Sequence, residues 1–537
     1  MARHAGLLMP LFSLRSHRDW GIGELADLGP FAVWMQRAGF DRLMLLPIGT
    51  MAGGADSPYT AASSMAIDPL YIAVDRVEDF PHGQRADPRD LSSEASSRLR
   101  EARASSAIRY GAVRAAKREA LERAFDQFLL DEWEPKTHRA ASFAAFLSRE
   151  RAWLDDYALF QAIRDRFNGR DWREWDEPLR SRDPAALDDM RRRLARDVLR
   201  QQHWQWIAQT QWTQARDTAH AHGVTILGDL PFVASADSAD VWSHQDEFRL
   251  DVSVGVPPDA FSETGQDWGL PMYRWDVMAA GGYRSFRARV QRMAALFDGL
   301  RVDHLVGLYR TYARPPGGEP FFLPAAEPAQ QRQGEDVLRI FLDSGLVVVA
   351  EDLGTVPDFV RASLARLGVP GCRILRWERD WHAPGQPFLD PAAYPAASAA
   401  MTGTHDTEPL PAWWEAAPLD EREALLELPV LRAHGLADPS HPWSDALRDA
   451  LLEQVYRSGS DELFLPIQDL FGWRDRINTP GTVGDRNWTW RLPWAVEDLE
   501  RESAAVERAR FSRELAAATA RSAPRARRVV RRDPGPG

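Results

Sequence analysis

The sequence has no long apolar run and almost no cysteine, and both absences narrow the possible functions. No apolar stretch approaches the roughly 20 residues that a membrane-spanning helix needs. A single cysteine, Cys372, excludes an internal disulfide framework and a metal cluster held by several cysteines. Residues 1–10 contain one arginine and a brief apolar stretch, too short for the core of a secretory signal. We therefore expect a cytoplasmic protein without a membrane segment.

A basic surface is also missing, because the formal net charge is -12. A protein that binds nucleic acid or another polyanion needs clustered positive charge to neutralise phosphates. We therefore expect an uncharged substrate and no nucleic-acid partner. The 537 residues, 44% of them apolar, suffice for two to four ordinary domains or for one large barrel with insertions. The sequence leaves the oligomeric state open.

Tryptophan, in contrast, is abundant, with 21 residues in the chain. Most large aromatic side chains serve protein cores. An excess of them also suits sugar binding, because the flat apolar face of a sugar ring stacks on an aromatic plane while its hydroxyls take polar partners.

Eight short apolar runs recur along the chain, and several of them end in charged residues. Near-continuous apolar runs are typical of strands that are covered on both faces, as in parallel α/β sheets. The eight runs are residues 6–14, 41–48, 223–231, 300–307, 345–354, 371–377, 399–406 and 463–470.

Helical patterns lie between most of these runs, for example over residues 31–38 and 286–297. Eight parallel strands alternating with helices predict an α/β fold of the (β/α)8 TIM-barrel type, whose active site lies at the carboxyl ends of the strands. A doubly wound open sheet is the alternative, but no glycine-rich phosphate loop follows the first run. The sequence favours the barrel.

The spacing of the runs predicts large insertions into one catalytic barrel that occupies residues 1–500. The second and third runs are about 175 residues apart, far more than one crossover needs, so we expect an inserted, mainly helical subdomain over residues 77–215. Two smaller insertions are expected, a Pro- and Ala-rich loop at 380–398 and a charged helical segment at 413–454. The basic segment 519–537 is predicted to be a disordered tail.

Four acids end the predicted strands, namely Asp229, Asp303, Glu351 and Asp406. Carboxylates gathered at one barrel mouth repel each other, so their presence together suggests a chemical purpose. Glycoside chemistry needs such a set, with one carboxylate as nucleophile and one protonated acid for the leaving oxygen. Like charges in one pocket also raise the pKa of one member, which keeps the acid protonated near neutral pH.

Two other interpretations compete for these acids. Arg301 lies two residues before Asp303, on the same face of a strand, so the two could form a structural ion pair. The pairs Asp303-His304 and His405-Asp406 could instead be ligands of a metal-dependent hydrolase. The metal interpretation is disfavoured, because metal sites tend to use histidines at helical or hairpin spacing. We expect no metal ion and no cofactor.

Several blocks of residues, in order along almost the whole chain, resemble those of one enzyme family, the 4-α-glucanotransferases, also called amylomaltases or disproportionating enzymes. This barrel family is related to the α-amylases, and no single block is specific by itself. The blocks are Ser57-Pro58-Tyr59, Gly228-Asp229-Leu230-Pro231, residues 237–242, 255–259 and 265–269, Arg301-Val302-Asp303-His304, residues 350–354, Thr404-His405-Asp406, and residues 478–482 and 487–491.

The resemblance implies a role for each matching residue. Asp303 is similar to the family nucleophile, Glu351 to the general acid/base, and Asp406 to the acid that stabilises the transition state. The segment 254–268 looks like the family's mobile loop over the donor groove. The positions similar to residues that contact glucose units in the family are Tyr59, Asp229, Gln266, Trp268, Arg301, His405 and Asn478.

The implied activity is transfer of α-1,4-glucan segments from a maltooligosaccharide, amylose, starch or glycogen chain to the 4-hydroxyl of an acceptor sugar, by a retaining double displacement. An α-1,4-glucan hydrolase of the amylase type and a non-catalytic glucan-binding protein are the alternatives. The sequence departs from the common pattern at Leu305-Val306, at Thr407-Glu408, where Asn-Asp is frequent, and at residues 392–394. These changes leave the acids intact, so they bear on donor length and product distribution.

Overall fold

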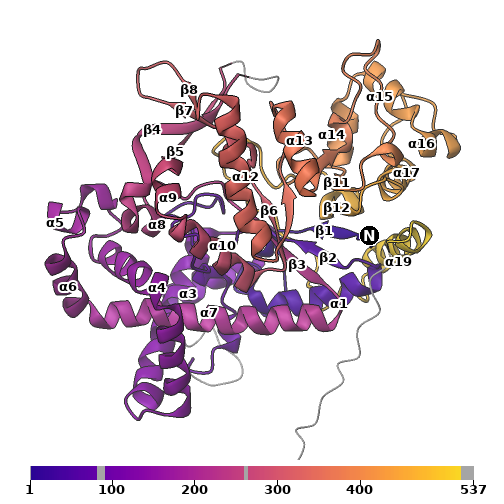
Figure 1. The fold of residues 1–537 in the computed structure, drawn as a ribbon. Coiled ribbons are helices and arrows are strands. Elements are labelled where there is room, and N and C mark those ends of the chain that lie inside the picture. The colour runs from indigo at the N-terminus through magenta and orange to yellow at the C-terminus, as the bar shows by residue number, and fades with distance from the viewer. Residues whose placement is uncertain (1, 81–90, 259–263, 522–537) are drawn as a thin grey trace, which may run out of the picture.

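Eight parallel strands close into a barrel at the centre of the molecule (Figure 1). The computed structural model describes residues 2–80, 91–258 and 264–521. The barrel confirms the predicted fold, because each of the eight apolar runs supplies one strand. Around the barrel the strands are β1 (Gly6–Leu8), β12 (Glu462–Pro466), β11 (Ser398–Met401), β10 (Gly371–Ile374), β9 (Val347–Ala350), β6 (Gly299–Val302), β3 (Thr225–Leu230) and β2 (Arg42–Met44).

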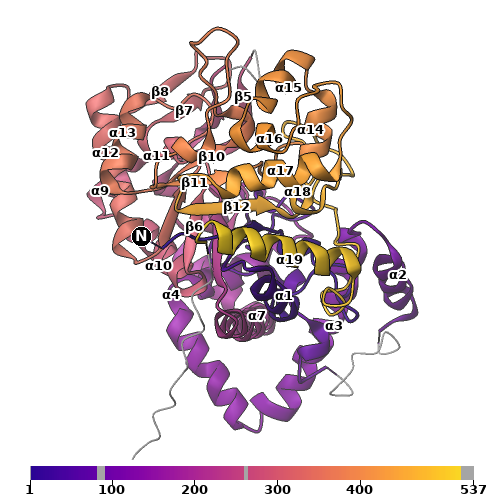
Figure 2. The ribbon, with the colours of Figure 1, turned by 90° about the vertical axis from the view of Figure 1, so that its right-hand side faces the viewer.

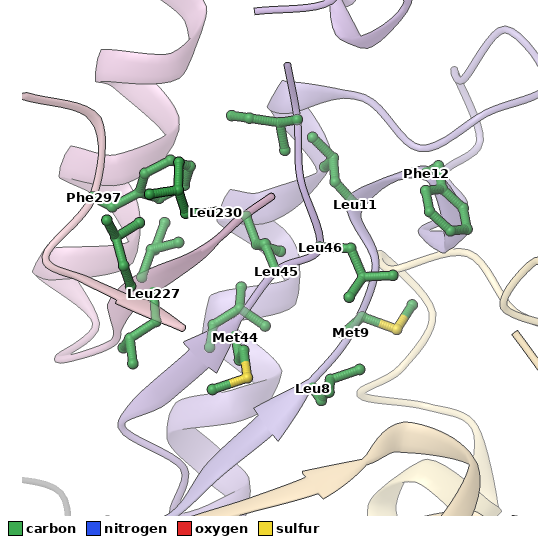
Figure 3. Packing of buried hydrophobic residues seen from close by; sticks show 14 of the residues in the cluster. Leu8, Met9, Leu11, Phe12, Met44, Leu45, Leu46, Leu227, Leu230 and Phe297 are labelled. Carbon is green, nitrogen blue, oxygen red and sulfur yellow. The ribbon is translucent and has the colours of Figure 1, made fainter. Parts of the chain in front are cut away.

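Apolar side chains of neighbouring barrel strands lie in rows across the sheet. Leu8 lies opposite Met44, which in turn lies opposite Leu227, so three strands place large apolar side chains in one row (Figure 3). On β3, Gly228 has no side chain, and a Cβ there would lie 2.8 Å from the ring of Phe297. This close approach lets Phe297 pack directly on the strand.

Helices connect most of the barrel strands and cover the barrel from outside. In α10, Phe286, Val290, Met293 and Leu296 recur at three- and four-residue spacing and are buried, as expected for an amphipathic helix on a sheet. The connection from β10 to β11 contains only short 3-10 turns. The covering helices are α1 (Leu28–Ala38), α7 (Ala195–Ala221), α10 (Arg284–Leu296), α12 (Glu327–Asp343), α13 (Asp358–Leu367), α17 (Asp445–Tyr456) and α19 (Ser503–Ala518).

The long connection between β2 and β3 is mainly helical. It lies on one side of the barrel, beside and beyond α7 (Figures 1 and 2). In its longest helix, α4, the side chains of Tyr157, Phe160 and Ile163 are buried, so they serve packing. The helices before α7 are α2 (Ser93–Ala104), α3 (Tyr110–Phe128), α4 (His138–Arg166), α5 (Glu177–Arg180) and α6 (Pro184–Arg193).

A second sheet lies on the opposite side of the barrel from α7 (Figures 1 and 2). Its antiparallel strands, in the order β5, β4, β7, β8, are β5 (Gln266–Tyr273), β4 (Phe248–Val256), β7 (Thr311–Arg314) and β8 (Phe321–Leu323). The segment 254–268, which looks like the family's mobile loop, is not irregular throughout, because its two ends belong to the paired strands β4 and β5. Residues 259–263, in the middle of that segment, lie outside the described residues.

The remaining helices are short and lie in the connections between or after the barrel strands. The segment 413–454 holds most of α14 and the whole of α15 and α16, which lie on the same side of the barrel as the second sheet (Figure 1). These helices are α8 (Ala239–Ser243), α9 (Trp275–Ala280), α11 (Val306–Tyr309), α14 (Leu410–Ala416), α15 (Leu419–Leu426), α16 (Pro429–Ala433) and α18 (Ile467–Phe471). Within the described part of the chain, every helix falls short of the length and apolar character that crossing a membrane requires.

The last described residues correct the predicted start of the tail at 519. Arg521 is fully buried, and its guanidinium donates to the carbonyl oxygens of His4, Tyr456 and Ser460. A buried arginine whose N–H groups meet carbonyl oxygens belongs to the folded body, so residues 519–521 do not belong to the predicted tail. Residues 522–537 lie outside the described residues.

Candidate active site

Arg301 holds two acids together at the carboxyl ends of β3 and β6. Its Nη1 atom lies 2.6 Å from Oδ2 of Asp229 and 2.9 Å from Oδ1 of Asp303. The Arg301 and Asp229 side chains are 4% and 0% exposed, whereas that of Asp303 is 29% exposed. Of the two acids, Asp303 is therefore the one that a ligand can reach. The buried Arg301, which is also paired with Asp229, holds Asp303 in place.

Asp229 is bound from a second side by Tyr59. The phenol O–H of Tyr59 donates a 2.8 Å hydrogen bond to Oδ2 of Asp229. Burial raises the pKa of Asp229 to about 6, with Arg301 opposing the rise and Asp303 adding to it. Burial also raises the pKa of Tyr59 well above its usual value, so the phenol stays a neutral hydrogen-bond donor.

Glu351 follows β9 and lies beside the Asp303 segment. Its Oε2 atom accepts a 2.8 Å hydrogen bond from the backbone N–H of His304, a residue with a φ of 44°. Burial raises the pKa of Glu351 to about 8, with Arg301 opposing the rise and Asp303 adding to it. Glu351 is therefore mostly protonated at neutral pH and can donate a proton.

Asp406, beyond the end of β11, has the opposite protonation state. Its Oδ1 atom accepts a 2.6 Å hydrogen bond from Nδ2 of Asn478, and its Oδ2 atom lies 3.3 Å from Nε2 of His405. Burial opposes ionisation, but His405 and the Asn478 hydrogen bond outweigh it and lower the pKa of Asp406 to about 2. Asp406 is thus a fixed negative charge.

Three aromatic rings pack against one another beside these acids. The Tyr59 and His405 rings stack with centroids 5.2 Å apart, and the Trp488 ring lies 5.7 Å from Tyr59 and 5.8 Å from His405. Trp488 was not among the predicted site residues, although it lies in the Asn487-Trp488 block that carries the family resemblance. That block was the only signal that could have identified it, because the long separation from Tyr59 hides the contact in the sequence.

The second sheet brings Gln266 and Trp268 to the same place. The Trp268 ring meets the His304 ring edge-on at 4.8 Å, and its indole N–H donates a 3.2 Å hydrogen bond to Oε1 of Gln266. The His304 ring also meets Phe232, at 5.7 Å. A Cβ on Gly307 would lie 2.7 Å from the Phe232 ring and 2.9 Å from His304, so only glycine fits there.

All ten predicted site residues therefore join one connected group, with His304 linking the second sheet to the acids. Among the described residues, no group of three or more His, Cys, Asp and Glu side chains is arranged to hold a metal ion. A cavity of about 330 Å³ lies elsewhere, between α4 and α10, and none of the ten residues lines it. The barrel mouth thus combines a protonated carboxyl group, Glu351, and an ionised one, Asp406, with the paired acids Asp229 and Asp303 and a row of aromatic rings.

Comparisons with known proteins point to one family. A family model described as 4-alpha-glucanotransferase matches residues 9–497. A protein of that name from Thermus thermophilus is 33% identical over 92% of this chain and 95% of its own length. Another, from Chlamydia trachomatis, is 31% identical over 93% of each chain.

Solved structures of similar proteins share the fold. An amylomaltase from Streptococcus agalactiae, in complex with acarbose, superposes with a TM-score of 0.80 at 27% identity, covering 97% of this chain and all of the other. An amylomaltase from Corynebacterium glutamicum, at 24% identity and a TM-score of 0.78, covers 95% of this chain and 75% of the other.

Proposed function

The chain belongs to the 4-α-glucanotransferase family, and on this premise we propose which residues carry out its reaction. The activity is the transfer of α-1,4-glucan segments between glucan chains. We assign Asp303 as the nucleophile, Glu351 as the general acid/base and Asp406 as the acid that stabilises the transition state. Tyr59, Asp229, Gln266, Trp268, Arg301, His405 and Asn478 are assigned to binding the glucose units and holding the acids in place.

In the first step, an oxygen of the Asp303 carboxylate attacks the anomeric carbon of the donor. The bond between that carbon and the bridging oxygen breaks, and the proton of Glu351 goes to the leaving oxygen. Arg301 keeps Asp303 aimed, because it pairs with Asp303 and with Asp229 at once. The fixed charge of Asp406 offsets the positive charge that develops on the sugar ring.

In the second step, the Glu351 carboxylate accepts the proton of the acceptor's 4-hydroxyl, and that oxygen displaces Asp303 from the anomeric carbon. Two inversions at one carbon retain the α configuration. An acceptor sugar outcompetes water where the site is covered. The sheet that carries Gln266 and Trp268 is well placed to provide that cover, since Trp268 lies against His304 beside the nucleophile.

The observation that carries these assignments is the contrast between Glu351 and Asp406. Glu351 has its pKa raised to about 8, partly by the charge of the partly exposed Asp303, whereas Asp406 has its pKa lowered to about 2. A double displacement needs a set of carboxyl groups that includes one protonated acid for the leaving oxygen and one fixed negative charge. A non-catalytic glucan-binding protein has no use for it.

We propose that the substrates are maltooligosaccharides, amylose and glycogen, and that the enzyme works in the cytoplasm. The partly exposed aromatic rings of Tyr59 and Trp268 are of the kind that sugar rings stack on. A single buried thiol, Cys372, is compatible with a reducing compartment.

Incubation of the enzyme with maltotriose in the presence of a metal chelator tests the proposal. A transferase produces glucose together with a ladder of longer maltooligosaccharides, whereas a hydrolase produces glucose and maltose alone. Asp303→Asn should lower the rate at least about 10⁴-fold, because it removes the nucleophile. Asp251→Asn, at an exposed position on β4, is the matched control and should leave the rate unchanged. Wild-type turnover by Asp303→Asn would rule out the assignment.

A further inference from the structure

Arg476, in the loop after α18, contacts the backbone on both sides of the Asp406–Asn478 hydrogen bond. Its Nη2 atom donates to the carbonyl oxygen of Asp406, and its Nε atom donates a 2.6 Å hydrogen bond to the carbonyl oxygen of Asn478. One guanidinium therefore fixes the backbone of both residues whose side chains meet at Oδ1 of Asp406.

The remaining nitrogen of Arg476 pairs with Glu408, two residues after Asp406. Nη1 of Arg476 donates to Oε1 of Glu408, and Oε2 of Glu408 lies 3.2 Å from Nη1 of Arg376. Arg376 also donates to the carbonyl oxygen of Glu408. Burial raises the pKa of Glu408, but its backbone hydrogen bond and both arginines outweigh burial and lower it, so the ion pairs are charged at neutral pH.

Arg376 is the rigid end of this set of ion pairs. Arg376 lies in the 3-10 turn that follows β10. Its side chain is 5% exposed, and its guanidinium lies over the Trp413 ring of α14, at 4.9 Å from the ring centroid. The Arg376–Glu408–Arg476 ion-pair chain thus joins the segments that follow β10, β11 and β12. A planar guanidinium with five donors can hold several oxygens in a fixed geometry, which a lysine ammonium cannot do.

We propose that Arg476 is a positioning residue for the reaction, which fixes Asp406 and Asn478 relative to each other, and that Glu408 is the counter-ion that orients it. The inference rests on the proposed role of Asp406 in stabilising the transition state. It gives a purpose to Glu408, which stands in the Thr407-Glu408 pair where the sequence departs from the common family pattern. Small displacements of a group that meets the transition state are costly, so the support of Asp406 matters to turnover.

A structural role alone makes a different prediction from a positioning role. If the ion-pair chain only stabilises the fold, its loss lowers the melting temperature and leaves kcat unchanged in the folded enzyme. If it positions Asp406, its loss lowers kcat in an enzyme that is still folded, while KM changes little, because Asp406 interacts more strongly with the transition state than with bound substrate.

The test measures kcat and KM on maltotriose, with melting temperatures, for Arg476→Met, Arg476→Lys, Glu408→Gln and the double variant Arg476→Met/Glu408→Gln. Arg474→Met is the matched control, since Arg474 lies two residues away in the same loop and pairs only at the surface with Glu415. Asp406→Asn is measured alongside.

We expect Arg476→Met to lower kcat about 100-fold with KM changed less than about threefold. Glu408→Gln should lower kcat about tenfold, and the double variant should match Arg476→Met alone, because Glu408 acts through Arg476. Arg476→Lys, which preserves the charge and the fold, should still lose about tenfold in kcat. Arg474→Met should behave as wild type.

Wild-type kcat in folded Arg476→Met or Arg476→Lys would overturn the inference, as would additive losses in the double variant. Full activity of Asp406→Asn would instead overturn the proposed role of Asp406. Loss of turnover in Asp406→Asn together with full activity in Arg476→Met would leave the proposed function intact and remove only the positioning role.

Discussion

The backbone N–H of His304 donates a 2.8 Å hydrogen bond to the carboxyl group of Glu351. The residue that follows the proposed nucleophile in the chain is therefore hydrogen-bonded to the proposed acid/base. His304 adopts a φ of 44°, a left-handed conformation that is uncommon outside glycine and is found at functional sites. The bond fixes the distance between the two catalytic segments, and it places Glu351 where burial controls its protonation.

The pH dependence of the reaction should follow from that protonation. Burial raises the pKa of Glu351 to about 8, so the proton needed for the first step is present below pH 8 and is lost above it. We expect kcat/KM on maltotriose to be half its maximum near pH 8 and to fall about tenfold per unit above it. The melting temperature at each pH controls for unfolding, and a flat profile up to pH 10 would contradict the assignment.

The same shift makes Glu351 a cost to stability in alkali. A carboxyl group whose pKa rises on folding binds its proton more tightly in the native state, so stability falls as pH rises from about 4.5 to about 8. Glu351→Gln cannot ionise and should melt higher than wild type at pH 9 while it melts at about the same temperature at pH 4. An unchanged difference between the two proteins at both pH values would contradict this. Asp251→Asn serves as the exposed control.

Replacing Arg301 should harm the enzyme more than losing one ion pair at the surface does. Arg301→Met leaves Asp229 buried without its cation, which raises the pKa of Asp229 further above 6, and leaves the charge of Asp303 unbalanced. We expect kcat/KM to fall about 10³-fold. Arg301→Lys should lose less, because the ammonium keeps a positive charge beside the two acids, but it should not reach wild type, because it lacks the planar guanidinium geometry. Arg249→Met, whose partner Asp251 is exposed, should have no effect.

Trp268 should control substrate binding and the exclusion of water. Trp268→Ala removes the ring that lies 4.8 Å from His304. We expect KM for maltotriose to rise about tenfold and the share of hydrolysis products to increase, because an open site admits water. Phe321→Ala, an exposed aromatic residue on β8 of the same sheet, is the control. Initial rates over a range of maltotriose concentrations give KM, and chromatography of the products gives the share of hydrolysis; an unchanged product ratio would place the cover elsewhere.

Arg521 should matter for stability and not for turnover. Its side chain is buried and donates to carbonyl oxygens of His4, Tyr456 and Ser460. Arg521→Met leaves these oxygens without their donors, at a cost of roughly 3 kcal/mol in the free energy of unfolding. Arg510→Met, exposed on α19, should cost nothing measurable. Urea unfolding measures the difference, while kcat of the folded enzyme should match wild type.

The barrel could be predicted from the sequence because strands covered on both faces are almost continuously apolar. The second sheet could not, because β4 and β5 are partly exposed, and the Gly- and Pro-rich segment between them resembles a loop. The tail was placed too early for a related reason, since basic composition predicts disorder and gives no indication that Arg521 finds carbonyl partners.

The acids were predictable because each follows an apolar run. Trp488 and Arg476 were not, because they lie in loops whose positions depend on the finished barrel. Arg476 is two residues from Asn478 in the chain, yet its contact with the carbonyl oxygen of Asp406 spans 70 residues. No periodicity in the sequence encodes such a contact.

The pairing of β1 with β12 also sets the order in which the enzyme can be completed during synthesis. Gly6 pairs with Phe464, so the first strand acquires its second neighbour only after some 460 residues have been added. At roughly 5–20 residues per second, that delay is on the order of 20–90 s. During this interval one edge of β1 has unpaired backbone groups. That edge must be kept from pairing with other chains until the last barrel strand emerges from the ribosome.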